Sequence, residues 1–118
     1  MASRREEYQE DAKLRIMQII VSNPQITSRQ IAKKIRISNG SAYYLITSLI
    51  DKGFIKLINF KESSEKIKYS YLLTPKGVRQ KSLLTGKFLV RKRKEYIALK
   101  EEINSFEQCL GIDSNNEK

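Results

Sequence analysis

The segment SNGSAYYLITSLIDKG, residues 38–53, holds the side chains best suited to recognition chemistry in this chain. The Asn39-Gly40 pair is a strong hairpin signal, yet here it opens an apolar run. Ser38 is a favoured helix N-cap, because its hydroxyl accepts a hydrogen bond from an unpaired amide two or three residues further on. We therefore interpret the segment as a helix whose exposed start carries hydrogen-bonding groups and two adjacent tyrosines.

The composition removes most catalytic chemistry. The chain has one cysteine, Cys109, and no histidine. An intramolecular disulfide, a cysteine zinc site, a histidine-ligated metal and a histidine-based triad are thereby excluded. The stretch Thr74-Pro75-Lys76-Gly77 lacks the spaced glycines of a phosphate-binding loop. We expect no enzyme activity and no cofactor.

The net charge indicates an anionic partner. The 118 residues include 23 Lys+Arg and 13 Asp+Glu, a formal charge of +10, and residues 99–118 are net acidic, so the basic surplus lies in residues 1–98. No apolar stretch approaches the roughly 20 residues that a membrane span needs, and no signal-peptide pattern opens the chain. We expect a cytoplasmic protein with one modest core and no membrane partner.

Three helices are predicted in the first half of the chain. Apolar residues at helical spacing predict the first over residues 8–21, ended by Asn23-Pro24. Thr27 and Gln30 form a T-x-x-Q capping box, so the second helix begins at Thr27. The third follows Ser38 after a short turn. The apolar positions of the first helix are Tyr8, Ala12, Ile16, Ile19 and Ile20.

A hairpin and a long helix complete the prediction. Gly53 is expected to cap the third helix. FIKLINF and IKYSYLL are rich in β-branched and aromatic residues, and the polar KESSEK separates them, so we expect two strands with a cationic tip. Thr74 offers an N-cap and Pro75 the preferred first helical position. The helix that they open extends to about Leu110, and Gly86 is a point where it bends or is interrupted.

This order of elements is the winged helix-turn-helix arrangement. The predicted fold class is mainly α with a small β-hairpin: a winged helix-turn-helix followed by a long C-terminal helix. The second helix of such a motif lies in the DNA major groove, with its N-terminal residues nearest the base edges. On a helical wheel, Tyr44 points away from the core, whereas Tyr43 lies at the edge of the buried face and either reads DNA or only packs. The predicted buried face consists of Ala42, Leu45, Ile46 and Leu49.

The predicted reading helix carries no cation, so phosphate contacts must come from its surroundings. Basic residues on the second helix, including Lys33 and Lys34, and on the hairpin could supply them. The alternative is a solvated helix face surrounded by solubilising lysines. The predicted DNA-binding residues are Ser28, Arg29, Ser38, Asn39, Gly40, Ser41, Tyr43, Tyr44, Thr47, Lys61, Lys66 and Lys68.

The C-terminal helix carries an apolar seam at alternating steps of three and four residues, which suits a short coiled coil. We expect it to form a homodimer, although the seam could instead fold back on the domain. The basic residues 91–94 beside it either reach flanking phosphates or are solvated. The predicted boundaries are 1–86 for the DNA-binding domain, 87–110 for the dimerisation helix and 111–118 for a disordered tail. The seam residues are Leu89, Tyr96, Leu99, Ile103, Phe106 and Leu110.

Three stretches together resemble the MarR-type winged-helix regulators. They are ITSRQIAKKIRISNGSAYYLITSLIDKGFIKLINF, KYSYLLTPKG and FLVRKRKEYIALKEEI. More narrowly, residues 8–108 are similar to the small MarR-like group associated with bacterial exopolysaccharide gene clusters. The resemblance implies a transcriptional regulator, usually dimeric, that reads DNA through Asn39, Gly40, Ser41, Tyr43, Tyr44 and Thr47 and uses residues 61–68 as a wing. Larger MarR proteins build their dimer from N- and C-terminal helices and often hold a phenolic ligand between them. The N-terminal extension here is short, so the sequence leaves open whether a small-molecule effector controls this chain.

Two function classes follow from these patterns. The first is a sequence-specific regulator that binds double-stranded DNA as a homodimer, and an RNA-binding version is a lesser variant of it. The second is a winged-helix protein-interaction module that docks a partner through the C-terminal helix. The first predicts a salt-sensitive affinity for duplex DNA, whereas the second predicts little DNA affinity and a heterologous complex.

Overall fold

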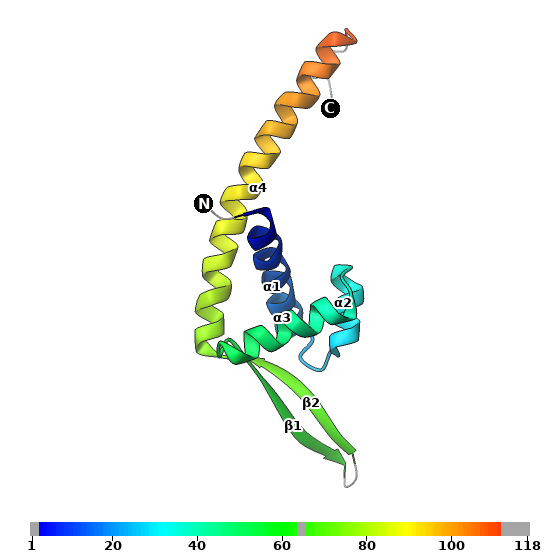
Figure 1. The fold of residues 1–118 in the computed structure, drawn as a ribbon, viewed down its shortest axis with the longest axis vertical. Helices are drawn as coiled ribbons and strands as arrows, with labels where there is room; N and C mark the ends of the chain where they lie inside the picture. Colours follow the sequence, from blue (N-terminus) through cyan, green and yellow to red (C-terminus); the bar gives the residue numbers. More distant parts are fainter. Residues whose placement is uncertain (1–2, 64–65, 112–118) are drawn as a thin grey trace. The chain divides into compact units, whose positions relative to one another are not determined.

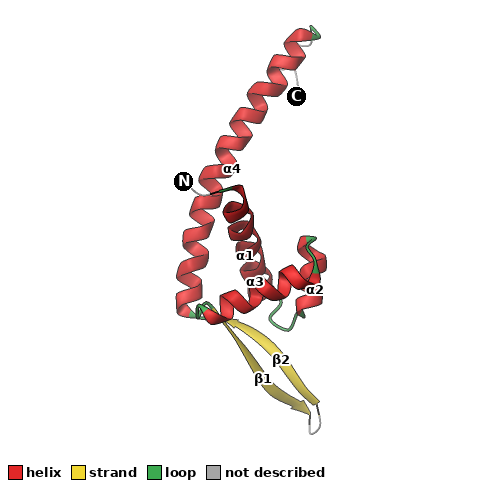
Figure 2. Cartoon of the chain, in the orientation of Figure 1, coloured by secondary structure: helices red, strands yellow, loops and turns green. Residues whose placement is uncertain are grey.

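The computed structural model describes residues 3–63 and 66–111, with side chains described outside residues 60–67. The elements follow one another as α1 (Arg4–Ser22), α2 (Ser28–Ile35), α3 (Asn39–Asp51), β1 (Ile55–Ser63), β2 (Lys66–Leu73) and α4 (Pro75–Cys109) (Figures 1 and 2). This confirms the predicted fold class: a winged helix-turn-helix followed by a long C-terminal helix. The chain divides into two compact units, Met1–Thr85 and Gly86–Lys118.

The core of the first unit lies where α1, α2 and α3 meet. Its largest fully buried side chains are Ile16, Met17, Ile20, Ile31, Leu49 and Ile55. Tyr8, one of the apolar positions that predicted the first helix, is 60% exposed and does not join the core. Helix α1 begins at Arg4 and its buried positions begin only at Ala12, so Tyr8 precedes the part of the helix that packs.

The connection from α2 to α3 is fixed by local hydrogen bonds. The Thr27 hydroxyl accepts from the Gln30 amide at 3.1 Å, and the Gln30 side chain accepts from the Thr27 amide at 3.0 Å, which confirms the capping box. Helix α2 ends at Arg36, which adopts a left-handed conformation with φ 60°. The Ile37 amide then donates to the Ala32 carbonyl at 3.0 Å. The chain thereby reverses within two residues and α3 can begin at once.

Helix α3 is bounded by the two predicted caps. The Ser38 hydroxyl accepts from the Ser41 amide at 3.0 Å, so Asn39 and Gly40 form the first turn of a helix and not a hairpin. At the other end Gly53 has φ 78°, and the Phe54 amide donates to the Leu49 carbonyl at 2.9 Å. This is a glycine-terminated helix end as predicted.

The wing is an antiparallel hairpin whose register pairs Ile55 with Leu73. Its strands are longer than predicted, because β1 extends through Ser63 and β2 begins at Lys66. Lys61 and Lys66 therefore belong to the strands and not to the tip. The ladder is made by backbone groups, which polar residues supply as well as apolar ones. The Tyr71 amide also donates to the Pro24 carbonyl at 2.8 Å, which ties the hairpin to the loop after α1.

Thr74 and Gly77 join the wing to α4. The buried Thr74 hydroxyl accepts from the Gly77 amide at 2.9 Å and donates to the Gly53 carbonyl at 2.6 Å. A Cβ on Gly77 would overlap the Phe54 carbonyl oxygen. The stretch Thr74-Pro75-Lys76-Gly77 thus forms a helix start packed against the end of α3.

Helix α4 continues through Gly86, so the predicted interruption is wrong. A helix tolerates an isolated glycine at a cost of about 1 kcal/mol relative to alanine. Near the start of the second unit, Glu95 pairs with Arg91 at 3.5 Å and with Lys92 at 3.2 Å. In the described residues, no helix combines the length and the apolar character that a bilayer crossing needs.

Candidate nucleic-acid interface

Helix α3 separates a buried apolar face from an exposed polar one. Ala42, Leu45, Ile46 and Leu49 are at most 4% exposed, as the helical wheel predicted. The outer face carries Tyr44, which is 63% exposed. Tyr43 is 67% exposed, so the expectation that it only packs is wrong. Both phenol rings are therefore available to a partner.

The start of α3 is exposed and its polar groups have different roles. The side chains of Asn39 and Ser41 are exposed, and Thr47 is half-buried one turn beyond Tyr43. The Ser38 hydroxyl donates a hydrogen bond to the Ser41 hydroxyl at 2.9 Å and also accepts one from the Ser41 amide. Ser38 is thus engaged in capping the helix, which leaves Asn39 and Ser41 as the polar side chains of this turn that face outward.

Gly40 is exposed in the first turn of this face. A Cβ added there would meet no other atom within 4 Å. The fold itself therefore does not require glycine at this position. An unsubstituted backbone at a helix start permits close approach of a ligand, which fits contact with a partner outside the chain.

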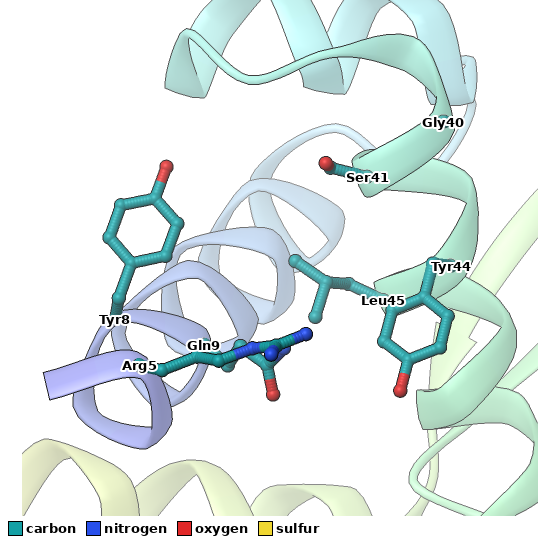
Figure 3. A pocket seen from close by; sticks show the side chains of 7 residues that line it. All are labelled: Arg5, Tyr8, Gln9, Gly40, Ser41, Tyr44 and Leu45. Atoms are coloured by element: carbon teal, nitrogen blue, oxygen red, sulfur yellow. The ribbon is translucent and has the colours of Figure 1, made fainter. Parts of the chain in front are cut away.

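Two shallow grooves flank Tyr44. One has a volume of about 530 Å³ and lies between the start of α1 and α3 (Figure 3). The other has a volume of about 410 Å³ and follows the outer face of α3 toward its C-terminal end. The first is lined by Arg5, Tyr8, Gln9, Gly40, Ser41, Tyr44 and Leu45; the second by Tyr43, Tyr44, Thr47, Ser48, Asp51 and Lys52.

Arg5 is a cation that the sequence analysis did not assign to this surface. Its side chain extends from α1 across the first groove toward α3 (Figure 3). No local pattern could have identified it, since its place depends on how α1 crosses α3. The predicted phosphate contacts lie on other elements: Arg29, Lys33 and Lys34 are exposed on α2, whereas Ser28 and Lys68 are half-buried. The side chains of Lys61 and Lys66 lie outside the described residues.

Two lysines of the first unit, Lys13 and Lys52, lie close enough for their charges to interact. Burial and the neighbouring Lys52 lower the pKa of Lys13 on α1. Lys52 follows α3, and its carbonyl accepts from the Lys76 side chain at 3.0 Å. Burial also raises the pKa of Tyr71 on the wing. Lys13, Lys52 and Lys76 therefore place positive charge at the C-terminal end of α3, next to the second groove.

Among the described residues, no group of three or more His, Cys, Asp and Glu side chains is placed to hold a metal ion. In the same part of the chain every buried side-chain nitrogen and oxygen has a hydrogen-bond partner. The exposed surface around α3 offers hydrogen-bonding, aromatic and cationic groups, and this combination is suited to binding.

Comparison with known proteins identifies the class of this domain. A family profile described as winged helix-turn-helix DNA-binding matches residues 9–56, which span α1 to the start of β1. Residues 9–56 are therefore similar to winged helix-turn-helix DNA-binding domains, and the fold of this part of the chain agrees with that likeness. No curated protein matches the sequence.

Solved structures with the same fold include MarR-family regulators. A mutant of MepR from S. aureus has a TM-score of 0.57 at 16% identity, over 90% of this chain and 85% of its own. A MarR family transcription regulator has a TM-score of 0.55 at 14% identity, over 91% and 79%. The MarR protein of Staphylococcus aureus has a TM-score of 0.51 at 21% identity, over 82% and 68%. At these identities the likeness establishes a common fold.

Proposed function

We propose that the chain is a MarR-like, sequence-specific transcriptional regulator that binds double-stranded DNA as a homodimer in the cytoplasm. The observation that carries the proposal is the outer face of α3, where two exposed tyrosines and an open glycine follow a capped helix start. Helix-turn-helix proteins insert this helix in the major groove. Its polar groups are then positioned to contact base edges.

The cations around α3 support binding of the DNA backbone. Arg29, Lys33 and Lys34 are exposed on the helix that precedes α3. In helix-turn-helix proteins this first helix crosses the DNA backbone, and neutralised phosphates supply much of the affinity. Arg5 in the first groove adds a further cation beside the start of α3. We assign these four residues to phosphate.

The apolar seam of α4 supports dimerisation. All six of its residues, from Leu89 to Leu110, are between 43% and 77% exposed. A stripe of this length on a helix is stabilised when a second apolar surface covers it. A second copy of the chain presents the same seam, so a symmetric pair would bury both.

The gene targets that we propose rest on resemblance alone. The chain is similar to a group associated with exopolysaccharide gene clusters, and we propose genes of exopolysaccharide biosynthesis as its targets. Mapping of bound DNA across the genome tests this directly. Binding confined to other genes would contradict this assignment and leave the DNA-binding proposal intact.

Two substitutions separate base reading from phosphate binding. Tyr44→Ala should weaken binding to the preferred site by about 1–3 kcal/mol and leave binding to random duplex nearly unchanged. Arg29→Ala should weaken both by similar factors, because phosphates carry no sequence information. Fluorescence anisotropy with both duplexes measures the four affinities. If Tyr44→Ala, like Arg29→Ala, weakened binding to the preferred duplex and to random duplex by equal factors, α3 would not read bases.

The exposed seam also favours a second candidate, a protein-interaction module that docks a partner through α4. This function predicts a stable complex with another protein and negligible affinity for duplex DNA at physiological salt. The same anisotropy measurement decides between the two, since the wild-type chain would then bind neither duplex.

A further inference from the structure

The reading face of α3 contains no side chain of the type that most often reads guanine. No lysine or arginine occurs between Arg36 and Lys52. A bidentate arginine or lysine on guanine O6 and N7 is the commonest specific contact in the major groove. The helix thus lacks the usual means of selecting a G·C pair.

The groups that are present match an A·T pair. Asn39 is exposed in the first turn, and its amide can bond adenine N6 and N7 together. Thymine differs from cytosine by a C5-methyl group in the major groove, which apolar surface contacts. The rings of Tyr43 and Tyr44, 67% and 63% exposed, offer such surface one turn further along.

The one charged side chain on this face is an acid at its far end. Asp51 is exposed and lines the second groove together with Tyr44. A carboxylate can accept from cytosine N4, but twelve residues of helix place Asp51 about 18 Å beyond Asn39. The N-terminal end of a reading helix lies nearest the bases. Asp51 therefore lies too far from the first turn to share in reading the base pair that Asn39 contacts.

We propose that α3 reads A·T base pairs, with Asn39 bonding adenine and the rings of Tyr43 and Tyr44 contacting thymine methyl groups. This inference rests on the proposed function, because it concerns the bases that the same face selects. Arg5 and Lys52, which line the two grooves beside this face, then contact phosphate and carry no base preference.

Selection from randomised duplexes with the full-length chain gives the first test. At a fixed salt concentration the enriched half-site should be A·T at the positions that α3 covers. Arg5→Ala provides the control, since it should lower affinity for all duplexes and leave the selected sequence unchanged. An enriched half-site with G·C at the covered positions would overturn the inference.

Replacement of single thymines by deoxyuridine gives the second test, because it removes one methyl group and no hydrogen bond. Wild-type affinity should fall about fourfold at a contacted thymine, as expected for loss of one buried methyl. Tyr44→Ala or Tyr43→Ala should abolish this sensitivity at one position each. Tyr44→Phe, which retains the ring, should preserve it.

The outcomes distinguish this inference from the function on which it rests. If the wild-type chain binds a selected duplex but ignores every uracil replacement, the tyrosines do not read methyl groups and the inference is wrong. If the chain binds no duplex at any salt concentration, the proposed regulator function itself fails, and the assignment of A·T reading fails with it.

Discussion

Two glycines in the first unit have opposite surroundings. Gly77 is buried at the start of α4, where an added Cβ would overlap the Phe54 carbonyl and lie 2.8 Å from Leu73 Cδ1. Gly40 faces open space at the start of α3. The first glycine is therefore required by the fold, whereas the second is free for contact with a partner.

Gly77→Ala should destabilise the protein. The methyl group forces the Phe54 carbonyl away from the start of α4, and overpacking of this kind costs about 1–3 kcal/mol. Urea unfolding followed by circular dichroism measures the loss. Gly86→Ala is the matched control, since its Cβ meets nothing within 4 Å and should stabilise the helix by about 0.5–1 kcal/mol. Equal unfolding midpoints for Gly77→Ala and the wild type would contradict the tight junction.

Gly40→Ala should separate stability from DNA binding. The substitution favours the helix by up to about 1 kcal/mol, so the unfolding midpoint should stay or rise. The new methyl group holds the helix start away from the base edges, and we expect affinity for the preferred duplex to fall at least about fivefold. Unfolding and anisotropy on one preparation give both values. An unchanged affinity would show that this turn does not approach DNA.

At the scale of elements, local chemistry predicted the start of α2 and both ends of α3, but not the start of α1, which lies at Arg4 and not at residue 8. The caps at Thr27, Ser38 and Gly53 act within a few residues of chain, and each forms the predicted bonds. The helical wheel likewise identified the buried face of α3, because burial there follows the 3.6-residue period. These features are local, so the sequence alone carries them.

Features that depend on tertiary packing were not predictable. The strands continue through Lys61 because the backbone ladder extends past the apolar residues. Tyr8 is exposed because α1 begins packing only at Ala12. Arg5 lies on the surface beside α3 because of how α1 crosses α3. The positions of Tyr8 and Arg5 depend on neighbours distant in sequence, whereas the hairpin extension pairs residues as close as Lys61 and Ile67.

A substitution in the α4 seam tests its role in dimerisation. Leu99→Lys places one charge from each copy in the expected interface and removes the leucine that each copy would bury there. This should weaken the dimer at least about a hundredfold. Ile97→Lys is the matched control, because Ile97 is equally exposed, at 55% against 54%, but lies outside the seam. Sedimentation equilibrium of the full-length chain compares them. Similar dimer stability in both variants would mean that the seam is not the interface.

At the scale of the whole molecule, the net charge indicates an anionic partner. The chain carries +10 in total, and its basic groups include exposed cations on α2, the helix that precedes α3. An anionic polymer is the natural partner of such a surface. In the proposed regulator, long-range attraction to any duplex and short-range reading by α3 are two separable contributions, of which only the first responds strongly to salt.

The most direct test of the central claim is a titration of the wild-type chain with its selected duplex and with random duplex at several salt concentrations. Both affinities should weaken as salt rises, by about a hundredfold between roughly 50 and 200 mM for the four phosphate contacts of one copy, and by more for a dimer. The selected duplex should remain the tighter ligand throughout. Affinities that do not change with salt, or that never differ between the two duplexes, would contradict a sequence-specific DNA-binding regulator.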